Sequence, residues 1–302
     1  MVVATVALGG ALAAPAGAAT VQVDTGFSSV VLEAAAGEVN AVQVVAIPGG
    51  FRVRDTGAPL SAGPGCAPVD AATVTCATDV NEVVVRLGDG NDVAALDLPA
   101  TAITTVEGGD GDDAISSGAS DDVLVGGAGD DTIAAGAGDD FVAGDIPIPG
   151  TSVAGTDALD GGTGNDTVTY GGTRTAMRID LAAGTAVGTG QADTLKGFEN
   201  VNGSPKDDVI RGDNRANRLY GDDGDDDLRG RGGKDVLDGG SGELRADGGS
   251  GNDAISGFLV GRVRCGSGRD LVDVTAVSGQ RPTARSVRSP GVEVGRDCER
   301  LT

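Results

Sequence analysis

Apolar side chains in this chain recur at intervals of nine residues, most of them two places after an acidic residue. In the stretch GGDGDDAIS, from Gly108 to Ser116, glycines hold the first, second and fourth places, Asp113 holds the sixth and Ile115 the eighth. An aliphatic residue between small or polar neighbours indicates a short strand with one buried face, and the glycines before it indicate a turn. The pattern therefore predicts a strand-and-turn unit that stacks many times, as in a solenoid.

The same frame continues through most of the chain, in two blocks. The first block has an eight-residue interruption at 144–151, and two isolated copies, beginning at Leu87 and Cys265, flank the blocks. Units of the blocks begin at Gly108, Ser117, Gly126, Ala135, Ser152 and Gly161, and then at Gly203, Gly212, Gly221, Gly230, Gly239 and Gly248.

Twelve of these fourteen units carry aspartate at the sixth place, and the exceptions are Asn217 and Leu244. The sixth-place aspartates are Asp92, Asp113, Asp122, Asp131, Asp140, Asp157, Asp166, Asp208, Asp226, Asp235, Asp253 and Asp270. Twelve units carry an aliphatic residue larger than alanine at the eighth place: Ile115, Leu124, Ile133, Val142, Leu159, Val168, Ile210, Leu219, Leu228, Leu237, Ile255 and Val272. Glycine-rich turns let backbone carbonyls converge, and a carboxylate supplies a hard anionic oxygen, so each turn is a candidate cation site.

These units resemble the RTX, or haemolysin-type, calcium-binding repeat, whose pattern is GGxGxDxUx with U a large apolar residue. The resemblance implies that two successive nonapeptides form one coil of a parallel β-roll and that calcium lies between stacked turns. It also implies that the twelve sixth-place aspartates are the side-chain ligands, assisted by turn carbonyls. The terminal regions are similar to those of exported, actinobacterial-type proteins of this kind that have no attached enzyme domain.

Two other interpretations of the repeats stay open at this stage. A disordered acidic linker would also be rich in Gly and Asp, but it has no reason to keep Asp and an aliphatic residue at fixed places of nine. A roll stabilised without metal would stack like charges about 4.8 Å apart, which costs roughly 1 to 4 kcal/mol per neighbouring pair. We therefore expect cations between the coils.

The composition restricts the kinds of metal ion and of partner that the chain is expected to bind. The chain has no His and four Cys, so it lacks the ligands that zinc, copper and iron prefer, whereas carboxylates and carbonyls suit several calcium ions better than magnesium. The net charge is −23, and residues 107–261 hold 30 acidic against 11 basic residues. This charge argues against nucleic acid and anionic membranes as partners.

The first 19 residues indicate export. Residues 2–19 are uncharged and end in PAGAAT, an A-x-A cleavage pattern after which Ala18 or Ala19 is the last residue removed. A buried strand or a helical anchor is the alternative, and no later stretch is long and apolar enough to cross a membrane. We expect a secreted protein that binds calcium and candidate polysaccharide or protein partners at the cell surface or in a matrix.

The regions outside the repeats predict caps. Residues 20–86 contain five apparent strands, TVQVD, SVVLE, AVQVVAI, FRVRD and EVVVRL, which predict an N-terminal β cap. Residues 257–302 form a short, mildly basic C-terminal cap that can cover an acidic roll end. Four cysteines allow three connectivities, and we expect Cys66 with Cys76 and Cys265 with Cys298, because each pair lies in one terminal region; four free thiols are the alternative.

Residues 170–202 keep no nonapeptide frame between the blocks, 87–169 and 203–256. We expect a spacer whose segments AMRIDL and LKGFENV add strands, and we expect Tyr170 and Arg174 to be exposed residues without a ligand. The expected fold is all-β: a parallel β-roll between an N-terminal β cap and a disulfide-closed C-terminal cap.

No catalytic constellation is evident. Without His there is no Ser-His-Asp triad, Cys-His dyad or HExxH zinc site, and neither GxSxG nor SxxK occurs. We therefore expect a structural or adhesive calcium-binding protein, not an enzyme. The alternative is a metal-assisted enzyme that acts on polysaccharides. Among the ligands, we expect Asp131 and Asp226, which have units on both sides, to matter more than Asp92, which stands alone.

Overall fold

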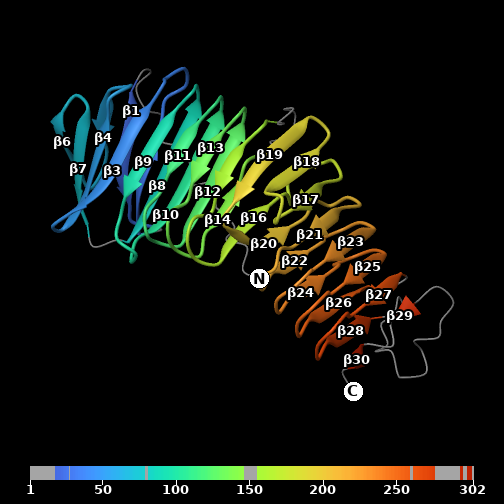
Figure 1. Ribbon diagram of the computed structural model, residues 1–302. Helices are drawn as coiled ribbons and strands as arrows, with labels where there is room; N and C mark the ends of the chain where they lie inside the picture. Colours follow the sequence, from blue (N-terminus) through green and yellow to red (C-terminus); the bar gives the residue numbers. More distant parts are fainter. Residues whose placement is uncertain are drawn as a thin grey trace.

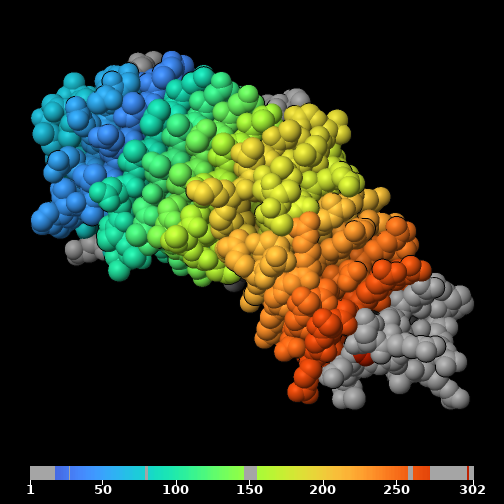
Figure 2. Space-filling model, viewed as in Figure 1, coloured from blue at the N-terminus to red at the C-terminus, as the bar shows by residue number. Residues whose placement is uncertain are grey.

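The computed structural model describes residues 18–26, 28–78, 81–145, 155–258, 261–275, 293–294 and 298–300. Two long sheets face each other across the core along an elongated stack, from β6 and β7 at one end to β29 and β30 at the other (Figures 1 and 2). No α-helix occurs in the described ranges, and none of their segments forms a helix that could cross a membrane. The predicted all-β roll is confirmed.

The first sheet, here sheet A, has 14 strands among the described residues. In spatial order they are β30 (Glu299–Arg300), β28 (Leu271–Thr275), β26 (Ala254–Phe258), β24 (Val236–Asp238), β22 (Arg218–Tyr220), β20 (Phe198–Asn202), β16 (Asp166–Thr169), β14 (Phe141–Ala143), β12 (Asp122–Ala128), β10 (Ile103–Asp110), β8 (Glu82–Asp89), β2 (Ser29–Glu33), β1 (Ala19–Asp24) and β5 (Leu60–Ala62).

The second sheet, here sheet B, has 16 strands in the same part of the chain. Their spatial order is β29 (Glu293–Val294), β27 (Arg262–Arg264), β25 (Leu244–Asp247), β23 (Asp226–Arg229), β21 (Val209–Arg211), β17 (Arg178–Asp180), β18 (Thr185–Gly188), β19 (Gln191–Lys196), β15 (Ala158–Asp160), β13 (Thr132–Ala134), β11 (Ala114–Ser116), β9 (Val93–Asp97), β3 (Ala41–Ile47), β4 (Gly50–Asp55), β7 (Thr73–Ala77) and β6 (Cys66–Asp70).

Each coil of the roll contributes one strand to each sheet, so equivalent places of every second unit lie side by side. Ile115 of β11 pairs with Ile133 of β13, and Leu219 of β22 pairs with Leu237 of β24, both in parallel register. All twelve predicted eighth-place residues are buried and belong to one continuous core between the sheets. One aliphatic side chain per strand is thus enough to form a thin core, because stacking joins the layers.

The turns depend on glycine at the second and fourth places. In one unit, Gly109 and Gly111 have φ of 118° and 133°, values that side chains rarely tolerate. A Cβ added to Gly111 would lie 1.8 Å from the carbonyl oxygen of Gly90 in the preceding coil. The turns therefore stack with their backbones in contact, which favours glycine at these places, although Asp222 and Arg231 hold second places with φ of 78° and 72°.

Antiparallel pairing marks the N-terminal region and the spacer. The five strands predicted before the repeats are present as β1, β2, β3, β4 and β8, and the structure adds β5, β6 and β7. In the spacer, β18 pairs antiparallel with both β17 and β19 in sheet B, whereas β20 lies parallel between β16 and β22 in sheet A. Sheet A therefore joins the two blocks in parallel register, and sheet B joins them through a reversed strand.

Two disulfides bond Cys66 to Cys76 and Cys265 to Cys298, as predicted. Cys66 and Cys76 face each other on the antiparallel strands β6 and β7 at the N-terminal end of sheet B. The predicted signal segment, except for its last two residues, lies outside the described residues, as do most of the interruption in the first block and most of the basic C-terminal segment.

Candidate metal centre

The twelve sixth-place aspartates lie in two columns, one at the start of the strands of each sheet. All twelve are buried, with exposed fractions of 0 to 2%. Column B, beside sheet B, contains Asp92, Asp113, Asp131, Asp157, Asp208 and Asp226, and column A, beside sheet A, contains Asp122, Asp140, Asp166, Asp235, Asp253 and Asp270. The repeat pattern thus brings neighbouring sixth-place aspartates of a column, 17 to 26 positions apart in the numbering, into contact through hydrogen bonds.

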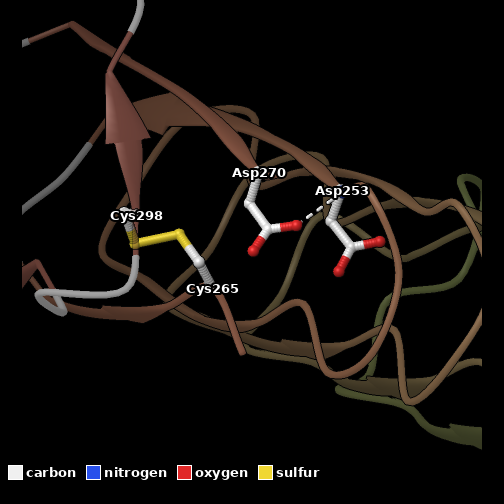
Figure 3. Close-up of a disulfide and its surroundings, with 4 residues drawn as sticks. All are labelled: Asp253, Cys265, Asp270 and Cys298. Carbon is white, nitrogen blue, oxygen red and sulfur yellow. Dashed lines mark hydrogen bonds between the residues drawn. A yellow bond between two sulfur atoms is a disulfide. The ribbon is translucent and has the colours of Figure 1, made fainter. Parts of the chain in front are cut away.

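One oxygen of each carboxylate except that of Asp122 links consecutive coils, and Asp122 Oδ1 instead accepts from the Ser120 hydroxyl in its own turn. Oδ1 of Asp131 accepts a hydrogen bond from the backbone N–H of Asp113 at 2.8 Å, and Oδ1 of Asp113 accepts one from Asp92 at 2.8 Å. The same bond recurs along column A, for example from Asp253 N–H to Asp270 Oδ1 at 2.9 Å (Figure 3). These bonds orient each carboxylate in the same way relative to its turn.

The second oxygen of nearly every carboxylate has no partner. In eleven of the twelve aspartates, Oδ2 is buried and accepts no hydrogen bond. A buried carboxylate oxygen without a donor is strongly unfavourable, because it loses hydration and gains nothing in exchange. A column of such atoms fits a row of bound cations.

Turn carbonyls face the same oxygens. A Cβ added to the first-place Gly108 would lie 2.2 Å from Asp113 Oδ2 and 2.4 Å from the carbonyl oxygen of Gly126. Gly230 repeats this geometry, with 2.2 Å to Asp235 Oδ2 and 2.6 Å to the oxygen of Gly248. The first-place glycine therefore leaves a space lined by a carboxylate and by a carbonyl of the next coil.

Side chains alone do not complete a metal centre. Within the described ranges, no three His, Cys, Asp or Glu side chains converge on one point as a metal site would require. An ion between coils must take the rest of its ligands from carbonyls. Oxygen-only coordination with flexible geometry suits calcium.

Burial opposes the charge on these groups. It raises the pKa of Asp113 to about 6, of Asp131 to about 7 and of Asp157 to about 8, and neighbouring carboxylates add to the effect. The pKa of Asp140 in column A also rises to about 7, again mainly through burial. A bound cation would offset this cost, because it stabilises the ionised form.

The isolated first copy and the interruption differ from expectation. Asp92 does not stand alone: its coil stacks beneath that of Asp113, and Asn40 N–H donates to Asp92 Oδ1 at 2.7 Å. The prediction of an isolated residue was wrong, because three additional residues between the units are accommodated within one coil.

The interruption does not precede its unit, as the frame predicted, but lies inside the turn. A Cβ on Gly144 would lie 1.9 Å from Asp157 Oδ2, as first-place glycines do, and one on Gly155 would lie 1.8 Å from the oxygen of the fourth-place Gly129. The unit therefore begins at Gly144, and the additional residues replace its third place.

Three residues that the repeat pattern did not reveal belong to the columns. Asp193 continues column B, accepting a hydrogen bond at Oδ1 from Asp157 N–H at 3.1 Å, and Glu199 continues column A, accepting one from Asp166 N–H at 3.0 Å. Asp193 keeps the triplet of an acid followed two places later by an aliphatic residue, Leu195, and this signal could have identified it. Asp145, at the second place of the interrupted unit, carries no such signal.

Tyr170 is buried, with an exposed fraction of 2%, and not exposed as predicted. Its hydroxyl donates to Asp193 Oδ2 at 2.9 Å, so the ring closes the end of column B in the first block. The sequence around Tyr170 has no repeat frame from which this contact could be inferred. Arg174 is exposed, as expected.

An arginine side chain lies beside column A where this column crosses the spacer. Arg215, at a fourth place, forms ion pairs with Glu199 and Asp213, and it donates to the carbonyl oxygen of Phe198 at 3.2 Å. The guanidinium thus takes carboxylate and carbonyl contacts of the kind that an ion would take. Beside it, the amide of Asn217 is hydrogen bonded at both ends, to Asp213 N–H and to the oxygen of Glu199.

In the second block, the first carboxylate of column B is hydrogen bonded within the protein, and the last place of the column is occupied by an apolar side chain. Asp208 is the one sixth-place aspartate with a bonded Oδ2, which accepts from Ser204 N–H at 2.6 Å. At the other end, the side chain of Leu244 occupies the carboxylate position, 2.9 Å from a Cβ added to Gly239. We therefore expect fewer ion sites in this half of column B than in column A.

The last coil of column A lies beside the C-terminal disulfide. Figure 3 shows Asp253 and Asp270 one coil apart, with the Cys265–Cys298 bond next to Asp270. Cys265 is fully buried, and its carbonyl oxygen lies 2.6 Å from a Cβ added to Gly248. The disulfide thus anchors a carbonyl that faces the last stacked turns.

Comparison with known proteins agrees with this geometry. The family described as the RTX calcium-binding nonapeptide repeat matches in 4 copies, over residues 107–142, 153–172 and 211–243. No curated protein matches the chain. RTX nonapeptide repeats bind Ca²⁺. The chain therefore contains RTX calcium-binding nonapeptide repeats, within a fold that is consistent with a β-roll.

Proposed function

We propose that this protein is a secreted, non-enzymatic calcium-binding protein with a structural or adhesive role outside the cell. In this proposal, bound calcium completes the folding of the chain. The observation that carries this function is the set of eleven buried carboxylate oxygens without a hydrogen-bond partner. The apo fold must bear their cost, and calcium relieves it only where calcium is abundant. The twelve column aspartates are the proposed side-chain ligands.

Export fits the same scheme. Disulfides form in oxidising compartments, and calcium is scarce in the cytoplasm but plentiful outside. Cleavage after Ala18 would leave Ala19, the fully buried first residue of β1, in the mature chain. The buried aspartates are poor candidates for catalysis, because a polymeric substrate cannot reach carboxylates that are at most 2% exposed.

Calcium titration of the mature protein near neutral pH tests this function. We expect far-ultraviolet circular dichroism to show a gain in strand content as calcium is added, and calorimetry to show several ions bound. Magnesium at the same concentration should have a much smaller effect, because it demands a tighter octahedral geometry. A spectrum that is fully folded in chelator, unchanged by calcium and without heat of binding would contradict the proposal.

A basic groove in the second block favours adhesion to an acidic polysaccharide. On the outer face of sheet B, strands β23, β25 and β27 line a shallow groove with Asp227, Arg229, Arg245, Asp247, Arg262 and Arg264. Four guanidinium groups with two carboxylates form a cationic patch on a chain of net charge −23. Arginine binds carboxylates in bidentate fashion, and aspartate accepts hydrogen bonds from sugar hydroxyls, so the groove suits a polymer that carries both groups.

Replacing Arg245 and Arg264 together by serine should reduce retention on immobilised hyaluronan in calcium by about tenfold. The control is the double replacement of Arg52 and Arg54 by serine, which changes the charge equally on the exposed face of β4, far along the roll. Equal retention of both variants would place the polysaccharide contact elsewhere or remove it.

A further inference from the structure

The insertion in the first block places a buried carboxylate inside a turn, at the second place, where the uninterrupted units of that block have glycine. Asp145 stands at the second place, and its exposed fraction is 4%. Gly109 and Gly127, at the same place in preceding coils, have φ of 118° and 126°, whereas Asp145 is not among the described residues with positive φ. Asp145 therefore carries its side chain without the strain that the left-handed conformation of those glycines would impose.

Asp145 and Asp157 lie against the same turn residues. Gly155 N–H donates to Asp145 Oδ2 at 3.4 Å, and a Cβ added to Gly155 would lie 3.0 Å from Asp157 Oδ1. Gly144, the neighbour of Asp145, faces Asp157 Oδ2, which would be 1.9 Å from an added Cβ. Each carboxylate keeps one buried oxygen without a partner, Oδ1 of Asp145 and Oδ2 of Asp157.

The surrounding donors satisfy the other oxygens. Gln191 Nε2 donates to Asp145 Oδ2 at 2.8 Å and to Asp193 Oδ2 at 3.1 Å, and the Tyr170 hydroxyl also donates to Asp193 Oδ2. Both oxygens of Asp193 are therefore bonded. No Lys or Arg in the described part of the chain pairs with these three carboxylates. Two oxygens stay available, held in fixed directions by neutral donors.

This level of the roll thus carries more uncompensated charge than the others. Regular turns offer at most one buried, unpartnered carboxylate oxygen each, and this turn offers two, from two residues. A larger number of charged ligands tightens binding of hard cations and favours higher ionic charge.

We propose that Asp145 and Asp157 form a distinct cation site at the insertion, which binds calcium more tightly than the regular turns and prefers trivalent lanthanide ions to calcium. This inference rests on the proposed function, because the site lies within the calcium-loaded roll proposed above. It differs from the regular turns in using a buried second-place carboxylate with an oxygen that has no hydrogen-bond partner. The insertion is then a device that adds a ligand to one chosen coil.

Terbium luminescence tests the site on the full calcium-loaded protein. Tyr170 and Tyr220 are the two tyrosines and there is no Trp, so light absorbed by Tyr170, which is bonded to Asp193 beside the site, should sensitise a bound Tb³⁺. We expect the signal to saturate near one equivalent of terbium added in excess calcium. Asp145→Asn and Asp145→Gly should each raise the terbium concentration needed by at least about tenfold.

Matched variants separate the antenna from the site. Tyr170→Phe should abolish sensitised emission while calorimetry still detects terbium uptake, and Tyr220→Phe should leave emission unchanged. Should Asp145→Asn fail to fold in calcium, Asp145→Gly, which restores the regular second place, decides the question. Wild-type titration curves in both Asp145 variants, or emission that depends on Tyr220, would overturn the site while leaving calcium binding intact. Absence of calcium heat in the wild type would instead overturn the proposed function.

Discussion

Calcium-free protein is expected to lose stability as the pH rises from about 5 to about 8, whereas calcium-loaded protein is expected to gain it. The reason lies in the column aspartates. In the folded protein burial raises the pKa of Asp113, Asp166 and Asp235 to about 6, of Asp131 and Asp226 to about 7, and of Asp157 to about 8. The unfolded chain should have values near 3.9 for all of them.

The sign follows from proton linkage. A group whose folded pKa lies above its unfolded pKa binds more protons in the folded state, so it contributes stability below the unfolded value, and this contribution disappears as the pH rises through the folded value. For these carboxylates the loss falls between about pH 4 and pH 8. With calcium the ionised form is the ligand, so protons compete with the ion and stability increases across the same interval.

Urea denaturation of calcium-depleted and calcium-saturated protein at about pH 5, 6.5 and 8 measures both trends. The lowest pH stays above the sequence pI of about 4.1, where the chain would precipitate most readily. A calcium-free midpoint that rises with pH, or that does not change, would show that the column carboxylates are hydrated or paired in solution.

The repeats explain why so much of this fold could be predicted. The nine-residue spacing predicted which aliphatic residues are buried and which aspartates point inward. It could do so because strand alternation and turn geometry repeat from one regular coil to the next. The spacer could not be predicted in the same way. Asp193 and Glu199 reach the columns through strands β19 and β20 without the glycine turn that identifies the other ligands.

Local irregularities also escaped prediction for physical reasons. The place of the insertion depends on which glycine faces Asp157 Oδ2, a contact between residues 13 positions apart that spacing alone cannot reveal. Tyr170 reads as a surface residue in an irregular segment, yet Asp193, 23 positions later, provides its buried partner. Both cases arise where coil length changes, so equal spacing no longer implies equal position.

An outer ladder of fifth-place residues is a further feature that the repeat frame did not identify. Asp112 Oδ1 accepts from Asp130 N–H at 3.0 Å, and Asp130 Oδ1 accepts from Thr156 N–H at 2.8 Å. The direction is opposite to that of the buried columns, because here the earlier coil supplies the acceptor. Turns with Asp at the fifth place, such as these, are thus held by two opposed bonds, of which only the inner one involves a proposed ligand.

Replacing Asp131 is expected to have opposite effects with and without calcium. Asp131→Asn keeps an acceptor at Oδ1 for Asp113 N–H but removes the charge that a cation needs. In saturating calcium it should destabilise the protein by about 3 kcal/mol, because the proposed sites place one ion on each side of this residue and each ion contributes about 1.4 kcal/mol at ten times its dissociation constant. Without calcium the same change removes a buried, unpartnered carboxylate and should raise stability above that of the wild type.

Asp131→Ala separates the hydrogen bond from the charge. It leaves the buried N–H of Asp113 without an acceptor, which costs about 1 to 3 kcal/mol more. This variant should therefore be less stable than Asp131→Asn both with and without calcium. Asp97→Asn, an equal charge change on an exposed residue of β9, is the control and should alter neither midpoint appreciably. Asp92→Asn should now behave like Asp131→Asn and not like the control, because Asp92 lies in the same column with an unpartnered Oδ2. Loss of stability in Asp131→Asn to the same extent with and without calcium would mean that the carboxylate serves packing alone and that no ion binds between these coils.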